Sequence, residues 1–162
     1  MKKQQHGVFL LEALIAILIF SLGILGMIAM GTAAIAGQSD AHVRTDAAAL
    51  ADQLAAEMAL NVNRLVDDAA TSASLTPFNH HPVSALGSYC AFTGAASTAP
   101  VVTAWLLRVT GPGGLPGAVA TGQSVRVDTS LTGHNQVTIS MCWRAPNDSG
   151  MRRFMTTVYV NR

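Results

Sequence analysis

The feature that most constrains this chain is an uninterrupted apolar segment near its N-terminus. From Ala13 to Ser39 the sequence runs for 27 residues without a charged side chain. A helix needs about 20 predominantly apolar residues to cross the hydrocarbon core of a bilayer, so this segment is long enough to span one. Lys2 and Lys3 precede it, and the positive-inside rule then keeps the N-terminus in the cytoplasm and sends the rest of the chain outward.

A cleaved secretory signal is the first alternative to a membrane anchor. Signal peptides have an apolar region of about 7–15 residues that ends at small residues of the A-x-A type, and Ala34-Ile35-Ala36 before Gly37 fits such a cleavage site. The apolar run is too long for that class, however, and a plain signal has no use for an acidic residue near its start. The sequence therefore favours an anchor, and a monomeric anchored or secreted binding domain stays as an alternative from another class.

Glu12 is the residue of the apolar region that needs an explanation. A charged group at mid-membrane costs about 2.5–3.5 kcal/mol on insertion scales, less near the edge, and usually has a functional partner. The cost would be small if Glu12 reached the lipid headgroups, but four apolar residues separate it from Gly7. Nothing nearby in its own helix supplies a cation, so the position of Glu12 predicts a cationic partner from elsewhere.

The stretch from Gly7 to Ala16, GVFLLEALIA, resembles the class III signal of type IV pilins and type II secretion pseudopilins. The resemblance implies that a prepilin peptidase cleaves after Gly7 and methylates the new amine on Val8, so that residues 1–7 form a leader peptide. Most members have Phe where this chain has Val8. The resemblance also implies that Glu12, the fifth mature residue, pairs with the N-terminal amine of a neighbouring subunit. Such pairing relieves the cost of an isolated acid in lipid.

Looser similarities point to a subclass. The sequence Leu22-Gly23-Ile24-Leu25-Gly26, Trp105 ahead of Leu115-Pro116-Gly117, and the segment 137–144 are similar to PilV-type minor pilins. That similarity implies a scarce subunit that helps initiate pilus assembly, lies at or near the tip, and supports adhesion and twitching motility. Before assembly it would lie in the inner membrane with its head in the periplasm. The implied partners are other minor pilins, the major pilin, the prepilin peptidase, the inner-membrane assembly platform and a tip adhesin. A minor pseudopilin of a type II secretion system is the related alternative.

The absence of proline before Pro77 allows one helix from about Phe9 to about Asp68. Sixty residues would span roughly 90 Å at 1.5 Å per residue. Residues 8–39 are expected to form the membrane or filament-core half of this helix. In that half Gly23, Gly26, Gly31 and Gly37 each cost about 1 kcal/mol relative to alanine. They allow either close helix–helix approach or, as the resemblance suggests, unwinding around residues 21–26 when subunits bundle.

Residues 40–70 are expected to form an amphipathic half. Its apolar side chains recur at three- and four-residue spacing, at Ala47, Leu50, Ala51, Leu54, Ala55, Met58, Val62, Leu65 and Val66. Polar side chains are expected on the opposite face, at Asp46, Gln53, Glu57 and Arg64. A free coiled-coil stalk is the alternative, but the wide, alanine-rich stripe favours packing of this half on a sheet.

Residues 71–162 are expected to form a globular head with a small antiparallel sheet, which makes the fold class α+β. Residues 71–87 have loop composition, and the adjacent His80 and His81 within them are expected to be solvated loop residues rather than metal ligands. A short helix is expected over 101–109, ended by the glycine-rich sequence 111–114. Alternation predicts strands over 124–130, 136–144 and 153–160, with a shorter strand near 117–121.

Cys90 and Cys142 are expected to form a disulfide, because a head outside the cytoplasm lies in an oxidising compartment.

Ten Lys and Arg against nine Asp and Glu give a net charge of +1, which excludes the strongly basic character of proteins that neutralise nucleic-acid phosphates. The residues Arg152, Arg153, Phe154 and Tyr159 make only a weak case for DNA contact. Since no catalytic or nucleotide-binding motif is present, the sequence indicates no enzyme activity, cofactor or metal site.

Overall fold

The computed structural model describes residues 6–85, 88–130, 134–145 and 148–160. The chain divides into two compact units, residues 1–41 and residues 42–162. The helix α1 (His6–Asn61) contributes its first part to one unit and its last part to the other.

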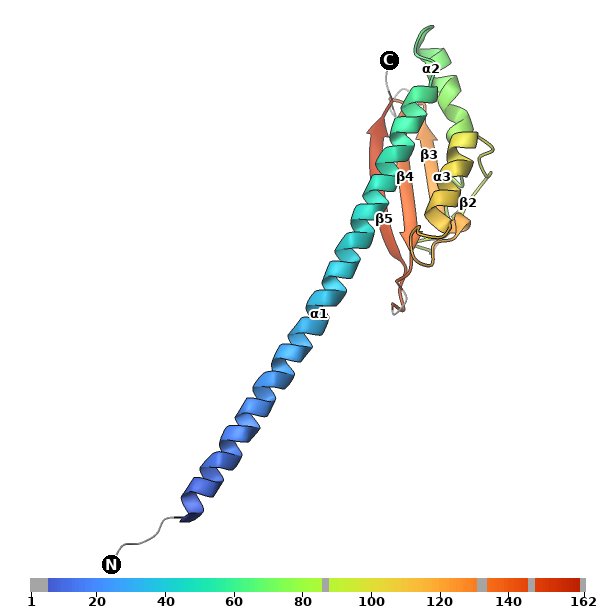
Figure 1. Ribbon diagram of the computed structural model, residues 1–162. Coiled ribbons are helices and arrows are strands. Elements are labelled where there is room, and N and C mark those ends of the chain that lie inside the picture. Colours follow the sequence, from blue (N-terminus) through green and yellow to red (C-terminus); the bar gives the residue numbers. More distant parts are fainter. Residues whose placement is uncertain (1–5, 86–87, 131–133, 146–147, 161–162) are drawn as a thin grey trace, which may run out of the picture. The chain divides into compact units, whose positions relative to one another are not determined.

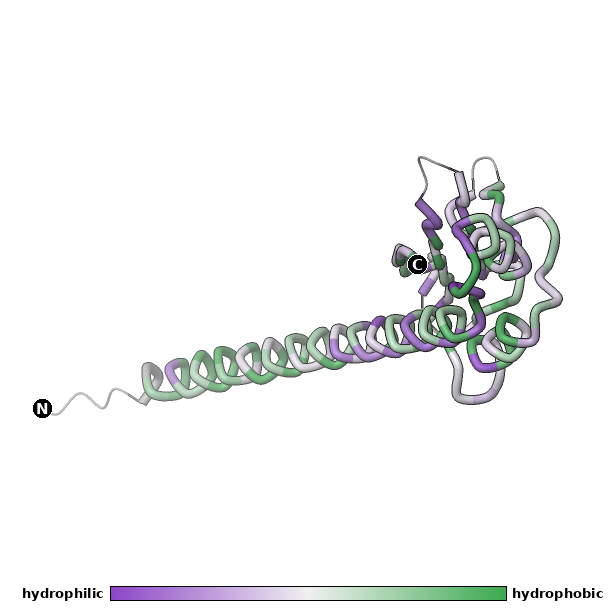
Figure 2. Tube along the Cα trace, turned by 90° about the horizontal axis from the view of Figure 1, so that it is seen from above, coloured by the Kyte–Doolittle hydropathy of each residue, from purple (hydrophilic) through white to green (hydrophobic). Residues whose placement is uncertain are grey.

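The first unit is the apolar part of α1. The side chains from Phe9 to Ser39 are all exposed, and Figure 2 shows this stretch coloured almost entirely as hydrophobic. Its most apolar window has a mean hydropathy of 2.7, and none of that window is buried inside the structure. The chain therefore has a helix long and apolar enough to cross a membrane, which fits an anchor or a signal.

The expectation that this helix continues to about Asp68 is wrong, because α1 ends at Asn61. The Asn61 Nδ2 donates a hydrogen bond of 2.7 Å to the backbone oxygen of Glu57, and the Asn63 Oδ1 accepts one of 3.1 Å from the Leu65 N–H. The Asp67 Oδ1 then accepts a bond of 2.6 Å from the Ala70 N–H and caps a separate helix, α2 (Asp68–Leu75). Such side-chain bonds to the local backbone compete with helix continuation.

The early end of α1 also shortens its apolar stripe. Ala47, Ala51, Leu54, Met58 and Val62 are buried as expected. Leu65 and Val66 lie beyond the helix and are 91% and 62% exposed, so their assignment to the stripe is wrong. The predicted apolar stripe is therefore confirmed from Ala47 to Val62, which lies directly after the helix.

The main sheet confirms the three principal strands. It has the order β3-β4-β5, with β3 (Gln123–Asp128), β4 (Gln136–Trp143) and β5 (Arg152–Tyr159) antiparallel to their neighbours. The register places Val125 opposite Ile139, and Ile139 opposite Thr156. His134 and Asn135 have φ values of 48° and 54° directly before β4, a conformation suited to a tight hairpin turn. Residues 131–133 of the expected turn lie outside the described residues.

The helix α3 (Pro100–Thr110) confirms the short helix expected over 101–109. It ends at Gly111, whose N–H donates a bond of 2.9 Å to the Leu107 carbonyl. A Cβ at this position would collide with the same Leu107 oxygen, so the first glycine of the 111–114 sequence is needed for the close approach. The strand expected near 117–121 is not formed, because Ala120–Gly122 is a 3₁₀ turn, η2.

The segment 71–87 contains more regular structure than a connecting loop. After α2 come a 3₁₀ turn, η1 (Thr76–Phe78), and a short strand, β1 (Val83–Ser84), which pairs with β2 (Phe92–Thr93). Two-residue strands carry too little alternation to be read from composition. Residues 86–87 lie outside the described part of the chain.

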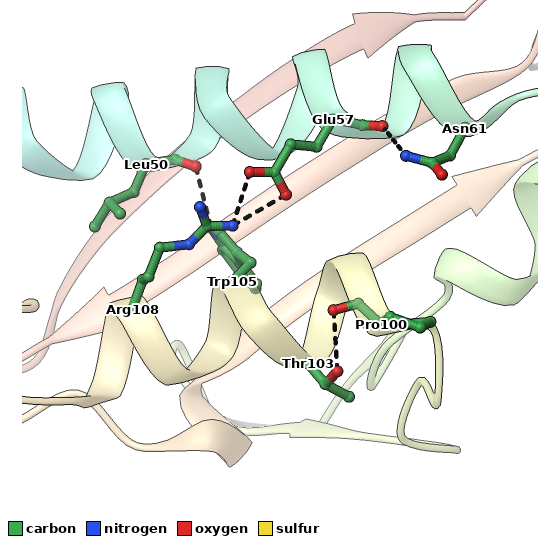
Figure 3. Close-up of polar contacts among 7 residues, drawn as sticks. All are labelled: Leu50, Glu57, Asn61, Pro100, Thr103, Trp105 and Arg108. Carbon is green, nitrogen blue, oxygen red and sulfur yellow. Dashed lines mark hydrogen bonds and ion pairs between the residues drawn. The ribbon is translucent and has the colours of Figure 1, made fainter.

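The core of the head lies between the helices and one face of the main sheet. Figure 1 shows the last part of α1 and α3 on the same side of β3, β4 and β5, and Figure 3 shows the two helices side by side with strands behind them. The largest fully buried side chains are Trp105, Trp143, Leu54, Met58 and Leu75. The alternating residues of β4 point into this core, at Val137, Ile139, Met141 and Trp143. The fold is therefore α+β, a long N-terminal helix packed on a small antiparallel sheet.

Candidate functional site

The residues expected to be processed lie in the first turns of α1, which begins at His6, one residue before Gly7. The bond between Gly7 and Val8 is thus within a helical stretch. Glu12 lies about one turn further on and its side chain is exposed. Within the described residues, Glu12 has no hydrogen-bond or ion-pair partner. Among the described residues, the structure therefore presents Glu12 as an exposed carboxylate on an apolar helix without an ionic partner.

The four glycines of the apolar part remain helical in this structure. Around Gly23, Gly26, Gly31 and Gly37, a Cβ would meet nothing within 4 Å, so none is required by packing within the single chain. Close helix–helix approach and unwinding around residues 21–26 therefore stay predictions about assembled subunits.

The expected disulfide is confirmed. Cys90 and Cys142 are bonded, with their Cα atoms 5.8 Å apart. Cys90 lies between β1 and β2, and Cys142 lies near the end of β4. The bond therefore fastens the small hairpin to the central strand of the main sheet.

Gln123 secures the strand end at this disulfide, a role that sequence patterns did not indicate. Its side chain is fully buried, and its Oε1 accepts a bond of 3.2 Å from the Cys142 N–H. Its Nε2 donates bonds of 2.8 Å to the Cys142 carbonyl and 3.1 Å to the Val119 carbonyl. The pairing of β3 with β4 stops at Gln123 opposite Met141. Because buried backbone groups must be paired, the Gln123 side-chain amide supplies the hydrogen bonds that the Cys142 backbone would otherwise lack on that side.

Glu57 differs from the expectation that it points away from the head. It is half-buried beside α3, and both carboxylate oxygens accept hydrogen bonds from the Arg108 Nη2, at 2.9 and 3.0 Å. About one turn before Arg108 on α3, the Trp105 Nε1 donates a bond of 3.0 Å to the Leu50 carbonyl (Figure 3). These contacts fix the spacing and register of α3 on α1. The sequence offers one signal for the ion pair, which is the basic residue Arg108 in the last turn of α3.

His80 is also different from the expectation of a solvated loop residue. Its side chain is 2% exposed, its Nδ1 accepts a bond of 3.2 Å from the Ser97 N–H, and its backbone forms a bridge with Val125 of β3. Burial, reinforced by the neighbouring His81, lowers the pKa of His80 below its usual value. The neutral ring is therefore part of the packed head. Within the described residues, no three His, Cys, Asp or Glu side chains gather to hold a metal.

We expect this histidine to make the head less stable in mild acid. A base whose pKa is lower in the folded state takes up its proton more readily when unfolded, so its contribution is present above the unfolded pKa of about 6.5 and is lost as the pH falls below that value. A His80→Asn variant keeps an acceptor near the Nδ1 position and should lose less stability between neutral pH and about pH 5. Denaturant unfolding of both proteins across this range measures the difference.

The matched control is His134→Asn, since His134 is exposed and its left-handed backbone suits asparagine. This control should retain the wild-type slope of stability with pH. If His80→Asn also retains it, the buried imidazole is not the group responsible.

The residues considered for DNA contact do not form one surface. Arg152 and Arg153 are adjacent on β5 and so point to opposite faces of the sheet. The Arg152 Nε is bonded to the Asp148 Oδ2 at 2.7 Å, and Phe154 packs against the core. The four residues considered for DNA contact therefore lie on different faces of the sheet and do not form one basic surface.

Comparison with known proteins gave no match to this chain, whether among family models, curated proteins or solved structures.

Proposed function

We propose that this chain is a minor type IV pilin of the PilV type, a structural subunit that helps initiate pilus assembly and is located at or near the tip. The observation that carries this proposal is Glu12. It is the only Asp, Glu, Lys or Arg between Lys3 and Asp40, it is exposed on an apolar helix, and it follows Gly7 by five positions in a sequence that resembles a prepilin signal.

The rest of the structure supports the same proposal. An apolar helix that continues into a head and packs there on an antiparallel sheet is consistent with a pilin-like layout. The disulfide is typical of a domain outside the cytoplasm. Within a filament, the exposed apolar part of α1 would be covered by the same part of neighbouring subunits, and the amine of Val8 from one subunit would neutralise Glu12 of another.

The proposal predicts that the mature protein starts at Val8 and carries an N-methyl group there. Purification from cells that contain the processing machinery, followed by N-terminal sequencing and intact-mass measurement, tests this prediction. Retention of residues 1–7 would contradict it, and a start at Gly37 would instead establish a conventional signal peptide.

Two variants separate these cleavage routes. Gly7→Leu should block processing if a prepilin peptidase acts on the chain, whereas Ala36→Leu should leave processing unchanged. The opposite pattern indicates cleavage before Gly37. A pilus subunit is then distinguished from a type II pseudopilin by deletion of the gene, which should reduce surface filaments in the first case and protein secretion in the second.

A further inference from the structure

The face of the main sheet that points away from α1 and α3 carries a groove of about 670 Å³. Val125 and Ile139 point into the core, so the residues that alternate with them point to this outer face. The floor of the groove consists of polar and charged side chains from all three strands, together with one methionine: Ser124, Arg126, Thr138, Ser140, Arg153 and Met155. Pro82, Val83 and Phe92 from the small hairpin form a wall.

Arg153 is the principal charge of this groove. Its side chain is half-buried, and its guanidinium lies 5.4 Å from the ring centres of both Tyr89 and Phe92. The Nη2 donates bonds of 3.0 Å to the Ser140 hydroxyl and 3.4 Å to the Met155 sulfur. Its Nε is buried and makes no hydrogen bond. Within the described residues, Arg153 therefore has only neutral partners, although a partly buried cation is stabilised best by an anion.

A second cation, Arg126, and the Thr138 hydroxyl also line the groove. Arg126 is opposite Thr138 in the register, and no carboxylate lines the described part of the groove. Asp128, two residues along β3 from Arg126, has its own partners, because Ser130 donates bonds of 2.6 Å from its hydroxyl and 3.0 Å from its N–H to the Asp128 Oδ1. Two arginines and one nearby aspartate leave a local charge of +1. This charge suits a monoanion better than a doubly charged phosphate.

We propose that this groove binds a carboxylate group, with Arg153 as its main ligand and Arg126, Thr138 and Ser140 as further donors. The planar guanidinium is matched to the two oxygens of a carboxylate. The carboxylate belongs either to a free organic acid or to a Glu or Asp side chain of a partner protein. In both cases the bound anion supplies the charged acceptor that Arg153 lacks.

The groove contains its own reporter, because the exposed Met155 lies in it next to Arg153. Methyl NMR of the full chain in detergent micelles, labelled with carbon-13 at the methionine methyl groups, follows Met155 directly. Met58 and Met141 are fully buried in the core and serve as internal standards for folding. The probes are butyrate, a blocked pentapeptide of Gly and Ser with one central Glu, and the same peptide with Gln, all at constant ionic strength.

We expect the Glu peptide to shift the Met155 signal in a saturable manner and the Gln peptide to leave it in place. Arg153→Gln should weaken binding at least about tenfold, as expected for the loss of a charged hydrogen-bond donor. Arg126→Gln should weaken it by a smaller factor. Arg152→Gln is the matched control, since it removes the same charge from the adjacent position on the other face, and binding should persist.

Saturable binding of both the Glu peptide and butyrate supports recognition of the carboxylate alone, and binding of the peptide alone supports a partner protein as its source. The proposal is overturned if no carboxylate gives saturable shifts, or if phosphate, sulfate or the Gln peptide binds as tightly. It is also overturned if Arg153→Gln binds normally. Unchanged Met58 and Met141 signals establish that each variant has kept its fold.

Discussion

Replacement of Glu12 by alanine should leave the chain in the membrane but reduce its recovery in sheared filaments by about tenfold or more. Removal of a carboxylate from an apolar helix lowers the cost of insertion, so anchoring does not suffer. In the proposed filament, however, the amine of a neighbouring subunit would lose its partner, and breaking a buried ion pair costs about 3–5 kcal/mol. Quantitative immunoblots of membrane and sheared fractions measure both effects.

Asp52→Asn is the matched control for this experiment. Asp52 is an exposed carboxylate on the same helix, but it lies in the head part rather than in the apolar part. Its replacement should leave filament recovery at the wild-type level. Normal recovery of the Glu12 variant would contradict the proposed pairing, even if processing at Gly7 were shown to occur.

The second large effect is expected at the disulfide. The bond closes a loop with a sequence separation of 52, and the chain-entropy model gives about 4 kcal/mol of stabilisation for a loop of this size. A Cys90→Ala/Cys142→Ala double variant should therefore melt roughly 15 °C below the wild type under non-reducing conditions. Thermal unfolding of the full chain in detergent, followed by circular dichroism of the head, provides the measurement.

Reducing agent supplies the control. It should lower the melting temperature of the wild type toward that of the double variant and leave the variant unchanged. Equal melting of the two proteins without reductant would show that the bond contributes nothing to the stability of the head. A fall in the melting temperature of the variant on reduction would point to an effect unrelated to the disulfide.

The two predictions concern different parts of the chain. Glu12 lies in the first unit, whose apolar side chains are exposed in the single chain. The disulfide lies in the second unit, which has its own hydrophobic core. A variant without the disulfide should therefore still be inserted and processed, and a Glu12 variant should retain the melting temperature of its head.

The features that could be predicted from the sequence are those encoded by neighbouring residues. The apolar helix follows from 27 uncharged residues, and the strands follow from alternation over 124–130, 136–144 and 153–160. The helix α3 follows from apolar spacing ended by glycine. The disulfide followed from the expected compartment and from there being only two cysteines. Each of these signals is local or compositional, so it is visible without knowledge of which segments meet.

The tertiary structure decided the features that depend on contacts between distant segments. His80 is buried because β3 and Ser97 lie against it, and Glu57 turns inward because α3 brings Arg108 to it. The end of α1 depended on competition between the helix and side-chain bonds of asparagine and aspartate, which differ too little in free energy to be ranked from composition. The groove around Arg153 exists only because the register of three strands and the disulfide-bound hairpin place its walls together. Periodicity determines which face of a segment is apolar, but the burial and charge environment of a single side chain depends on the other segments that pack against it.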